Sequence, residues 1–505
     1  MYTISDIISN NARNLGQREA LVAGGRRLSF IELDQEVARA AGALQSLGVE
    51  KGDRVAIMGR NTLSWIISAM GALRAGAILV PINHKLMPPE VEFITRHCGA
   101  KILIFETTLA NVVRETHTPA LKLMIDATAG GTGDTDGFPR MEPLLAQQLP
   151  FSPVPLASGD QAEILYTSGT TGKPKGCMHS HENILLSGIA TNLIYHLGQT
   201  DKTLIAMPVW HCFPLNNLLL GSFYVGATVV LMPEYHPLEF LKVIQAERCT
   251  MFFGAPIAYT MPLKAISQFD EFDLSSVRIW LYGGGPIDPE TVRLLVKRYR
   301  TDRFFQVFGM TETGPTGLAL YPHEQQSKAG SIGCQAASGC IFKVMKNDAE
   351  AAGAGEVGEI WMRCQSMMQG YYLDSEATRA AFHDGWYMTG DLARVDADGY
   401  LFIVDRVKDM IITGGENVYS KEVEDVLSAF PGVGEVAVIG KPHPEWGESV
   451  VAVIARGGNA AALDEQAIRD FCATRIAKYK IPREFRFVDA LPRTPTGKVM
   501  NYKLR

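Results

Sequence analysis

The chain has 505 residues, enough for two to four domains with a large core. Its 47% hydrophobic and 20% charged residues describe a globular protein, and its net charge of −6 argues against a nucleic-acid partner. Eight cysteines without a CxxC pair or a Cys/His cluster favour reduced thiols over disulfides or a zinc site. The amino terminus has no signal-peptide pattern, so we expect a cytoplasmic protein without an integral membrane segment.

Between residues 53 and 105, short β-rich runs alternate with segments of helical pattern. This alternation is typical of βαβ units that build a parallel sheet. The Gly, Thr and Asp cluster at 129–137 predicts an exposed loop, and the apolar run at 164–166 predicts a buried strand. The other elements expected here are strands at 54–58, 77–80 and 102–105 and helices at 64–73 and 88–97.

The same pattern returns after residue 176, with strands expected at 228–232, 250–253, 277–282 and 303–307. Residues 204–233 contain no Asp, Glu, Lys or Arg, but prolines, asparagines and glycines interrupt them. A buried strand–helix–strand unit is therefore expected there instead of a membrane span.

The sequence pattern changes at residue 331. Short β runs with turn signals up to residue 404 predict a small antiparallel sheet or barrel. A compact α+β segment follows Arg406. Its expected elements are a capped helix at 420–427, strands at 435–439 and 450–455, and a helix at 464–475.

Residues 166–176 read Tyr-Thr-Ser-Gly-Thr-Thr-Gly-Lys-Pro-Lys-Gly and follow the apolar run. Glycine amides, hydroxyls and lysines in this order suit a phosphate chain, although a polar surface loop is the alternative. The string is not a Walker A loop, because Thr167 stands where its first glycine belongs and Pro174 follows the lysine. The candidate phosphate-binding residues are Thr167, Ser168, Gly169, Thr170, Thr171, Gly172 and Lys175.

A second motif, residues 306–313, offers an aromatic ring, a hydroxyl and a carboxylate able to hold a hard cation. Taken alone, its Thr-Glu pair is more often a helix cap. Three glycines at 283–285 follow an expected strand and allow a flat ligand to approach closely, or form a tight turn. Further along, Asp391 can accept ribose hydroxyls and Arg406 can pair with ribose or phosphate, unless they are an ordinary surface pair.

Together these motifs resemble the adenylate-forming superfamily, which includes acyl- and aryl-CoA synthetases, peptide-synthetase adenylation domains and luciferases. The matches run in family order from about residue 20 to the end. The resemblance implies an α/β fold, with a large N-terminal domain of two βαβ-rich parallel-type sheets and a small mobile α+β C-terminal domain. It places the N-terminal domain at 1–404, with a β-barrel-like subdomain at 331–404, the hinge at 405–409 and the C-terminal domain at 410–505.

The resemblance also implies roles in ATP binding. Phe308, Gly284 and Gly285 lie near adenine, Thr311 contacts phosphate, and Glu312 binds Mg²⁺. Lys498, in the segment 492–498, steadies the substrate carboxylate and the α-phosphate, and Lys408 is the hinge residue. Asp391 and Arg406 keep the ribose and phosphate roles described above.

The second substrate implied is coenzyme A. In relatives, the segment matching Gly414 and Gly415 lines the pantetheine tunnel. Trp446 and Tyr479 match aromatic positions near the CoA nucleotide, and Lys85 can meet its phosphates. Ile481 departs from the chlorobenzoate-type ligases, which carry a basic residue there.

The acid is constrained by exclusions drawn from the same resemblance. Trp210, His211, Gly283 and Gly309 fall at the acyl pocket. No aspartate stands where peptide-synthetase domains hold an α-amino group. Acetate-specific enzymes carry Trp where this chain has Gly309, and malonate ligases carry Arg where this chain has Gln306 and Val307. An uncharged aryl, aryl-propenoic or medium-chain acid remains.

The expected reaction is therefore ATP-dependent ligation of a carboxylic acid to CoA through an acyl-adenylate, with Mg²⁺ as cofactor. An acyl-AMP ligase that loads a carrier protein is the alternative within the same chemistry, and a non-catalytic nucleotide-binding relative is the alternative from another class. The oligomeric state stays open, with a homodimer as one option.

Overall fold

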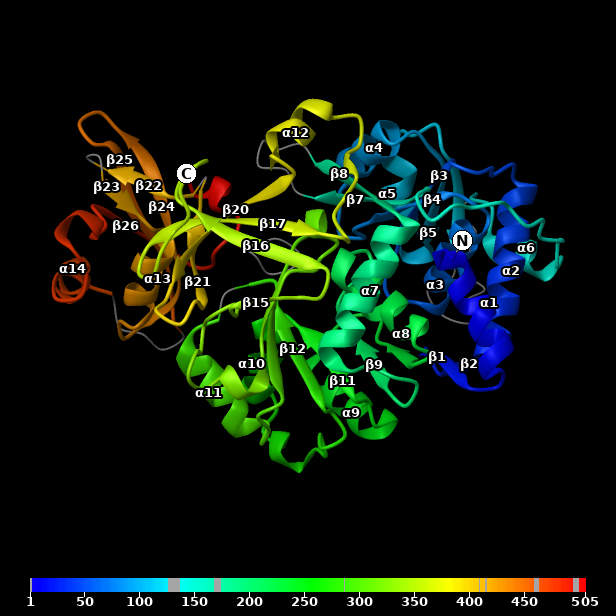
Figure 1. The fold of residues 1–505 in the computed structure, drawn as a ribbon, viewed down its shortest axis with the longest axis horizontal. Helices are drawn as coiled ribbons and strands as arrows, with labels where there is room; N and C mark the ends of the chain where they lie inside the picture. Colours follow the sequence, from blue (N-terminus) through cyan, green and yellow to red (C-terminus); the bar gives the residue numbers. More distant parts are fainter. Residues whose placement is uncertain are drawn as a thin grey trace.

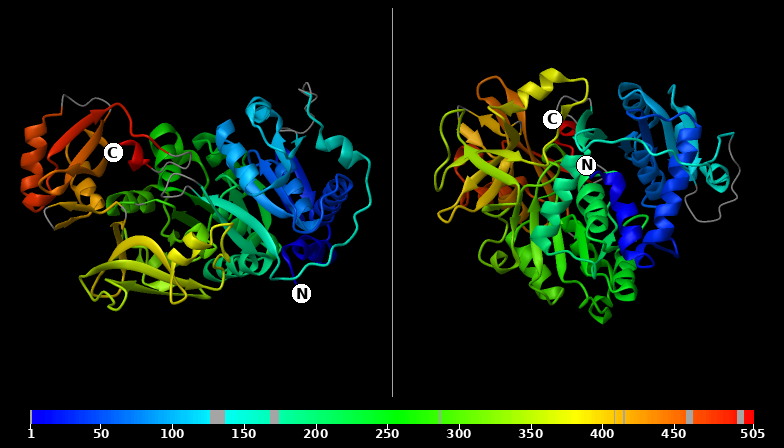
Figure 2. Two further views of the ribbon diagram at one scale, coloured as in Figure 1. Left: turned by 90° about the horizontal axis from the view of Figure 1, so that it is seen from above. Right: turned by 45° about the vertical axis from the view of Figure 1, so that its right-hand side comes forward.

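The computed structural model describes residues 2–125, 137–167, 174–285, 287–407, 409–413, 416–457, 463–493 and 499–505. Within these ranges the strands form four sheets. Figure 1 shows the N-terminal elements at one end of the long axis and the last strands and helices at the other. The two further views keep that order (Figure 2).

The largest sheet has nine strands in the order β15-β14-β13-β12-β11-β9-β10-β1-β2. Its six central strands are parallel, and β2, β14 and β15 are antiparallel additions at the edges. The strands expected from the sequence in this region are confirmed. The bounds are β1 Glu19–Ala23, β2 Arg26–Ser29, β9 Lys202–Ile205, β10 Thr228–Leu231, β11 Met251–Gly254, β12 Ile279–Gly283, β13 Phe304–Phe308, β14 Leu318–Leu320 and β15 Gln335–Ala336.

The second sheet has seven strands in the order β18-β8-β7-β4-β3-β5-β6. The run from β7 to β6 is parallel, whereas β7 and β8 form an antiparallel pair that β18 extends. This arrangement confirms the parallel βαβ prediction. The bounds are β3 Arg54–Met58, β4 Ile78–Ile82, β5 Ala100–Glu106, β6 Leu121–Ile125, β7 Gln161–Thr167, β8 Lys175–Ser180 and β18 Gly370–Tyr371.

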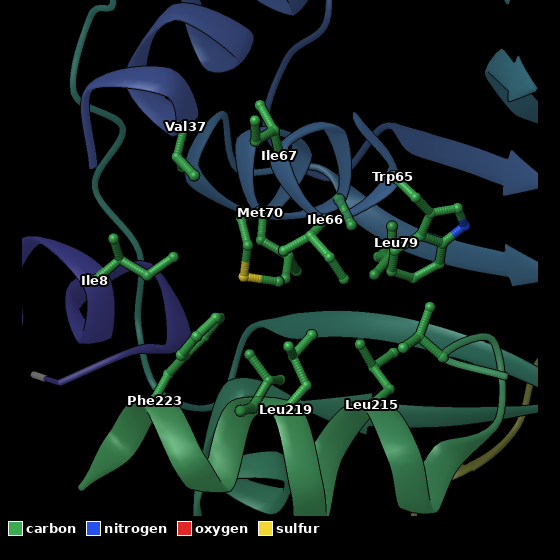
Figure 3. Close-up of a cluster of buried hydrophobic side chains, with 14 of the residues drawn as sticks. Ile8, Val37, Trp65, Ile66, Ile67, Met70, Leu79, Leu215, Leu219 and Phe223 are labelled. Carbon is green, nitrogen blue, oxygen red and sulfur yellow. The ribbon is translucent and has the colours of Figure 1, made fainter. Parts of the chain in front are cut away.

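Helices fill the space between the two sheets. In Figure 3, Trp65, Ile66 and Met70 of α3 face Leu215, Leu219 and Phe223 across this core. Because α3 is covered on all sides, ten of its twelve residues are buried. The central helices are α1 Ile4–Leu15, α2 Phe30–Ser46, α3 Leu63–Arg74, α7 His181–Tyr195, the π-helix η2 Phe213–Leu220 and α8 Gly221–Tyr224.

The segment at 204–233 confirms the strand–helix–strand prediction, since β9 leads into η2 and α8 and then into β10. In the described ranges no helix is both long and apolar enough to cross a membrane. The other helices of this part are α4 Pro88–His97, α5 Ala110–Glu115, α6 Met141–Ala146, α9 Pro237–Glu247, α10 Pro256–Ala265 and α11 Pro289–Arg298.

The third sheet is antiparallel and comes from the stretch predicted to be a small sheet or barrel. Its order is β16-β17-β20-β19, with β21 on β20. Two short strands of the same stretch, β15 and β18, join the large sheets, so the stretch is not confined to one unit. The bounds are β16 Cys340–Met345, β17 Val357–Cys364, α12 Ser375–Ala380, β19 Phe382–His383, β20 Trp386–Val395 and β21 Leu401–Arg406.

The C-terminal α+β unit packs two helices on a sheet of order β23-β22-β25-β24, with β26 parallel to β25. Its α13 begins at Ser420 as expected, but the expected cap is wrong. Tyr419 at the N-cap makes no side-chain capping hydrogen bond, and the Asp405 carboxylate accepts the Ser420 N–H instead. The bounds are β22 Ile411–Thr413, β23 Glu416–Val418, α13 Ser420–Ser428, β24 Val433–His443, β25 Gly447–Arg456, α14 Glu465–Ala473 and β26 Glu484–Val488.

Candidate active site

The glycine-rich string is carried by the β7–β8 hairpin. Thr167 pairs with Lys175 across the hairpin, so the two strands bring both ends of the string to one point. A Cβ at Gly176 would lie 2.6 Å from the Ile164 side chain, so close packing of the hairpin requires glycine there. Five of the predicted phosphate-binding residues lie outside the described residues: Ser168, Gly169, Thr170, Thr171 and Gly172.

Tyr371 connects this hairpin to the Thr-Glu motif. Its hydroxyl donates to Glu312 Oε1 at 3.1 Å, and the Lys175 ammonium lies 5.0 Å from the centre of its ring. Burial and the neighbouring Glu312 carboxylate raise the pKa of Tyr371, so the hydroxyl keeps its proton and acts as a donor. Sequence reasoning missed Tyr371, because no motif marks a strand of two residues.

Thr311 and Glu312 lie in a 3-10 turn, η4 Thr311–Thr313, directly after β13. The capping hydrogen bonds of this turn are made by Thr313, whose hydroxyl accepts from Met310 N–H and donates to Met310 O. Capping therefore does not account for Glu312. Its own backbone is held by Met368, whose N–H donates to the Glu312 carbonyl at 2.9 Å.

Two of the three glycines at 283–285 face open space. A Cβ at Gly284 or Gly285 would meet nothing within 4 Å, and Gly284 has a φ of +75° that disfavours other residues. A Cβ at Gly283 would instead lie 2.5 Å from the Val307 carbonyl oxygen. Glycine at position 283 thus permits close contact between β12 and β13.

Gly309 is crowded in a way that the sequence comparison did not reveal. A Cβ there would lie 2.8 Å from the Pro315 carbonyl oxygen and 2.9 Å from its carbon. Any side chain at this position would push against backbone. A large residue would therefore not simply fill an acyl pocket, as the comparison with acetate-specific enzymes suggested.

Asp391 and Arg406 are directly opposite each other on β20 and β21. Arg406 Nε lies 3.0 Å from Asp391 Oδ1, and Asp391 is buried while half of the Arg406 side chain is exposed. The sequence assigned both residues to the nucleotide separately. The structure shows that they form one ion pair, so a ligand would meet them as a unit.

A hydrogen-bonded chain holds the segment around His211. The Trp210 ring lies against the His211 ring with 3.9 Å between centroids, and its N–H donates to His84 Nδ1 at 3.2 Å. His84 Nε2 lies 3.3 Å from Glu234 Oε1. Burial lowers the pKa of His84, which fits a neutral ring that accepts at Nδ1 and donates at Nε2.

Asn61 anchors the same segment from the neighbouring sheet. Its Oδ1 accepts from Val209 N–H at 2.8 Å, and its Nδ2 donates to the carbonyls of Met207 and Met232. Sequence reasoning found Trp210 and His211 but missed His84, Glu234 and Asn61. No motif in the sequence signals these three residues, since they belong to other elements.

The residues predicted to bind CoA lie on two parts of the molecule. Lys85 is exposed after β4, whereas Trp446 and Tyr479 are 42% and 37% exposed in the C-terminal unit. The Arg483 guanidinium lies 4.5 Å from the centre of the Trp446 ring, although the sequence analysis assigned no role to Arg483. The predicted residues Gly414, Gly415, Lys408 and Lys498 lie outside the described residues.

Two family profiles match the chain. The profile described as AMP-binding enzyme covers residues 8–372, and the profile of the AMP-binding enzyme C-terminal domain covers residues 422–498. A feruloyl-CoA synthase of Amycolatopsis sp is 35% identical, with 98% of this chain and 96% of the relative covered. The long-chain-fatty-acid–CoA ligase FadD13 of Mycobacterium tuberculosis is 34% identical, with 95% of this chain and 93% of the relative covered.

Solved structures agree with the profiles. The o-succinylbenzoate CoA synthetase MenE of Bacillus subtilis, in complex with its acyl-adenylate intermediate, superimposes with a TM-score of 0.88 at 28% identity. That match covers 99% of this chain and 97% of the MenE chain. The same enzyme has also been solved with ATP and a magnesium ion.

Fold and matched residues together define an adenylate-forming enzyme, an AMP-forming acid–thiol ligase that uses ATP, Mg²⁺ and CoA. The chain belongs to the AMP-binding enzyme family, among the acyl- and aryl-CoA synthetases.

Proposed function

We propose that the enzyme activates an uncharged aryl, aryl-propenoic or medium-chain carboxylic acid and transfers it to CoA. The observation that carries the proposed site is the contact chain Lys175–Tyr371–Glu312, which joins the phosphate-loop hairpin to the Thr-Glu turn. Relatives named for ferulate and for long-chain fatty acids support an acid with a large apolar part.

Glu312 is the proposed Mg²⁺ ligand. One carboxylate together with phosphate oxygens and water is a donor set that Mg²⁺ takes in nucleotide sites, and the Tyr371 hydroxyl orients this carboxylate. When bound, the ion would neutralise phosphate charge. Thr167 and Lys175 would contact the phosphates from the hairpin, and the Asp391–Arg406 pair would meet the ribose from β20 and β21.

The first half-reaction needs little general-base catalysis, because a carboxylate is already a nucleophile. One carboxylate oxygen attacks the α-phosphorus of ATP, the bond to the bridging oxygen breaks, and pyrophosphate leaves. What the protein supplies is in-line placement and positive charge. We assign that charge to Lys175, Arg406 and Lys498.

In the second half-reaction the CoA thiol loses its proton and attacks the acyl carbonyl, and AMP leaves. We propose that the unit after residue 410 turns about Lys408 between the steps, so that one site serves both. Trp446 and Tyr479 present exposed rings for the CoA nucleotide. Arg483, stacked on Trp446, supplies the cation that is missing at Ile481.

The acyl group is proposed to lie beside His211, Trp210 and Phe213. The rings of Phe213 and Phe253 are 4.5 Å apart and form an aromatic wall next to this segment. Such a wall favours an apolar acid.

The deciding experiment is an AMP-release assay across a panel of carboxylic acids, with CoA in one arm and a holo-carrier protein in the other. We expect release with CoA. Release only with the carrier would establish the acyl-AMP ligase alternative, and absence of pyrophosphate exchange with every acid would contradict catalysis altogether.

Eight free thiols support a reducing, cytoplasmic setting.

Assays of the two half-reactions distinguish the proposed roles of Lys498 and Lys408. Lys498→Ala should abolish acyl-adenylate formation yet largely spare CoA transfer to a supplied acyl-adenylate, and equal loss in both steps would refute its role. Lys408→Pro should do the reverse, because a fixed φ impedes a hinge. Collapse of pyrophosphate exchange in Lys408→Pro would show that the hinge lies elsewhere.

A further inference from the structure

A buried polar cluster lies behind the phosphate-loop hairpin, and the ligation reaction gives it no role. Glu163 on β7 and His179 on β8 are directly opposite each other, and Cys212 and Asn216 come from the turn and π-helix after His211. Their exposed fractions are 1%, 1%, 5% and 0%, respectively. Donor atoms of Glu163, His179 and Cys212 all lie within 4.8 Å of one another.

Hydrogen bonds leave this cluster incomplete. Within the described residues, neither ring nitrogen of His179 has a hydrogen-bond partner, and neither has Asn216 Oδ1. The Asn216 amide nitrogen donates to Glu163 Oε1 and lies 3.4 Å from Cys212 Sγ. Buried polar atoms without partners are rare in folded proteins and commonly indicate a bound ion or water.

The composition of the cluster favours a cation. Glu163 forms no ion pair with any residue in the described part of the chain, and burial raises its pKa to about 8, so without a bound cation the carboxyl keeps its proton at pH 7. A carboxylate, an imidazole and a thiol are together the donor types that Zn²⁺ binds.

The geometry needs only small adjustment. Zinc–ligand bonds of about 2.0–2.3 Å place neighbouring donor atoms of a tetrahedral site roughly 3.3–3.8 Å apart. The three donor atoms lie within 4.8 Å of one another, so each pair would have to approach by at most about 1.0–1.5 Å. Flipping the Asn216 amide, which exchanges the positions of its oxygen and nitrogen, would direct the oxygen toward Glu163 and Cys212 as a fourth donor.

The surroundings of His179 also fit a ligand. His179 is buried close to the Thr311 backbone, although no hydrogen bond of ordinary geometry joins a ring nitrogen to it. A metal-bound histidine usually directs its second ring N–H to a carbonyl or carboxylate. Thr311 belongs to the turn that carries Glu312.

We propose that Glu163, His179, Cys212 and Asn216 form a structural Zn²⁺ site. Such an ion would tie three segments together: the β7–β8 hairpin, the π-helix after His211 and, through His179, the Thr-Glu turn. Binding would release the protons of the Cys212 thiol and the Glu163 carboxyl, and no redox change is involved. The site would hold the phosphate loop in position without touching substrate.

The first test uses the full-length wild-type enzyme from zinc-supplemented cells, passed over a weak chelating resin. We expect close to one equivalent of zinc per chain by elemental mass spectrometry, and a lower melting temperature after a strong chelator removes it. Protein from cobalt-supplemented cells should show the visible bands of tetrahedral Co²⁺ with a near-ultraviolet thiolate band. Wild-type enzyme that lacks metal in both preparations would overturn the proposal.

Variants locate the ion. Cys212→Ala and His179→Gln should each weaken zinc binding by at least about tenfold. The matched control is Cys177→Ala, since Cys177 is a buried thiol on β8 that lies near Glu312 and Cys212 but is not one of the four proposed ligands. Cys249→Ala is a control for loss of a distant buried thiol. Loss of zinc in Cys177→Ala with full retention in Cys212→Ala would refute the assignment, and Glu163→Gln replaces any variant that fails to fold.

Discussion

Tyr371→Phe removes a single oxygen atom at the contact between the β7–β8 hairpin and the Thr-Glu turn. The change removes the hydroxyl that donates to Glu312 Oε1 and keeps the ring beside the Lys175 ammonium. Tyr371→Leu is the matched variant that removes both contacts. If Glu312 holds Mg²⁺, loss of the hydroxyl should leave its carboxylate less well oriented.

The expected size follows from the geometry. A hydrogen bond to a charged group contributes about 1.5–3 kcal/mol. Its length of 3.1 Å exceeds the common O–H···O distance, which favours the lower end of that range. About 1.5 kcal/mol corresponds to roughly a tenfold fall in kcat/KM for pyrophosphate exchange. The Mg²⁺ concentration at half-maximal rate should rise, while the KM for the acid stays close to the wild-type value.

The assay is pyrophosphate–ATP exchange over a Mg²⁺ titration, with thermal melting as the control for folding. Tyr371→Leu should lose more than Tyr371→Phe, because it also removes the ring that contacts Lys175. A well-folded Tyr371→Phe enzyme with unchanged Mg²⁺ dependence would refute the reasoning, since the hydroxyl would then not orient a metal ligand.

Other changes give three further tests. Burial raises the pKa of Glu424 from its ordinary value of 4.5 to about 7. Between these two pH values the unfolded chain releases a proton that the folded chain keeps. The free energy of unfolding therefore falls as the pH rises from 4.5 to about 7. Glu424→Gln keeps an acceptor for Val438 N–H and should remove most of this pH-dependent loss of stability, which is roughly 3 kcal/mol in the wild type. If the melting temperatures of the variant and the wild type differ by the same amount at pH 4.5 and at pH 8, the prediction is contradicted. Gly309→Ala should cost about 1–3 kcal/mol because its Cβ meets the Pro315 carbonyl, and an unchanged melting temperature would show that the turn yields freely. Arg483→Ala should raise the KM for CoA several-fold without slowing pyrophosphate exchange, whereas equal effects on both would place Arg483 outside the CoA site.

Local pattern in the sequence determined most of the secondary structure. The predicted strand at 54–58 and helix at 88–97 agree with β3 and α4, because burial periodicity and proline at a helix start act within a few residues. The strand predicted at 435–439 was too short. In the structure β24 extends to Val433–His443, since pairing with β25 continues through exposed residues that have no apolar pattern.

The candidate motifs were also visible in the sequence, because a phosphate loop or a Thr-Glu turn is a contiguous string. The partners of these motifs were not visible. Tyr371 reaches Glu312, and Asp391 pairs with Arg406, only through the register of separate strands. A shift of one residue in either register would turn those side chains to the opposite face.

The buried cluster shows most clearly that sequence patterns do not reveal contacts between distant residues. Linear spacing of cysteines and histidines argued against a zinc site, because known zinc motifs place their ligands close together in the chain. Folding brings Glu163, His179 and Cys212 together from β7, β8 and the turn before the π-helix. The sequence by itself determined which local elements form and which strings are candidates for phosphate binding. Only the tertiary structure decided which distant side chains share one buried space, because that depends on strand register and on how η2 packs against the sheet.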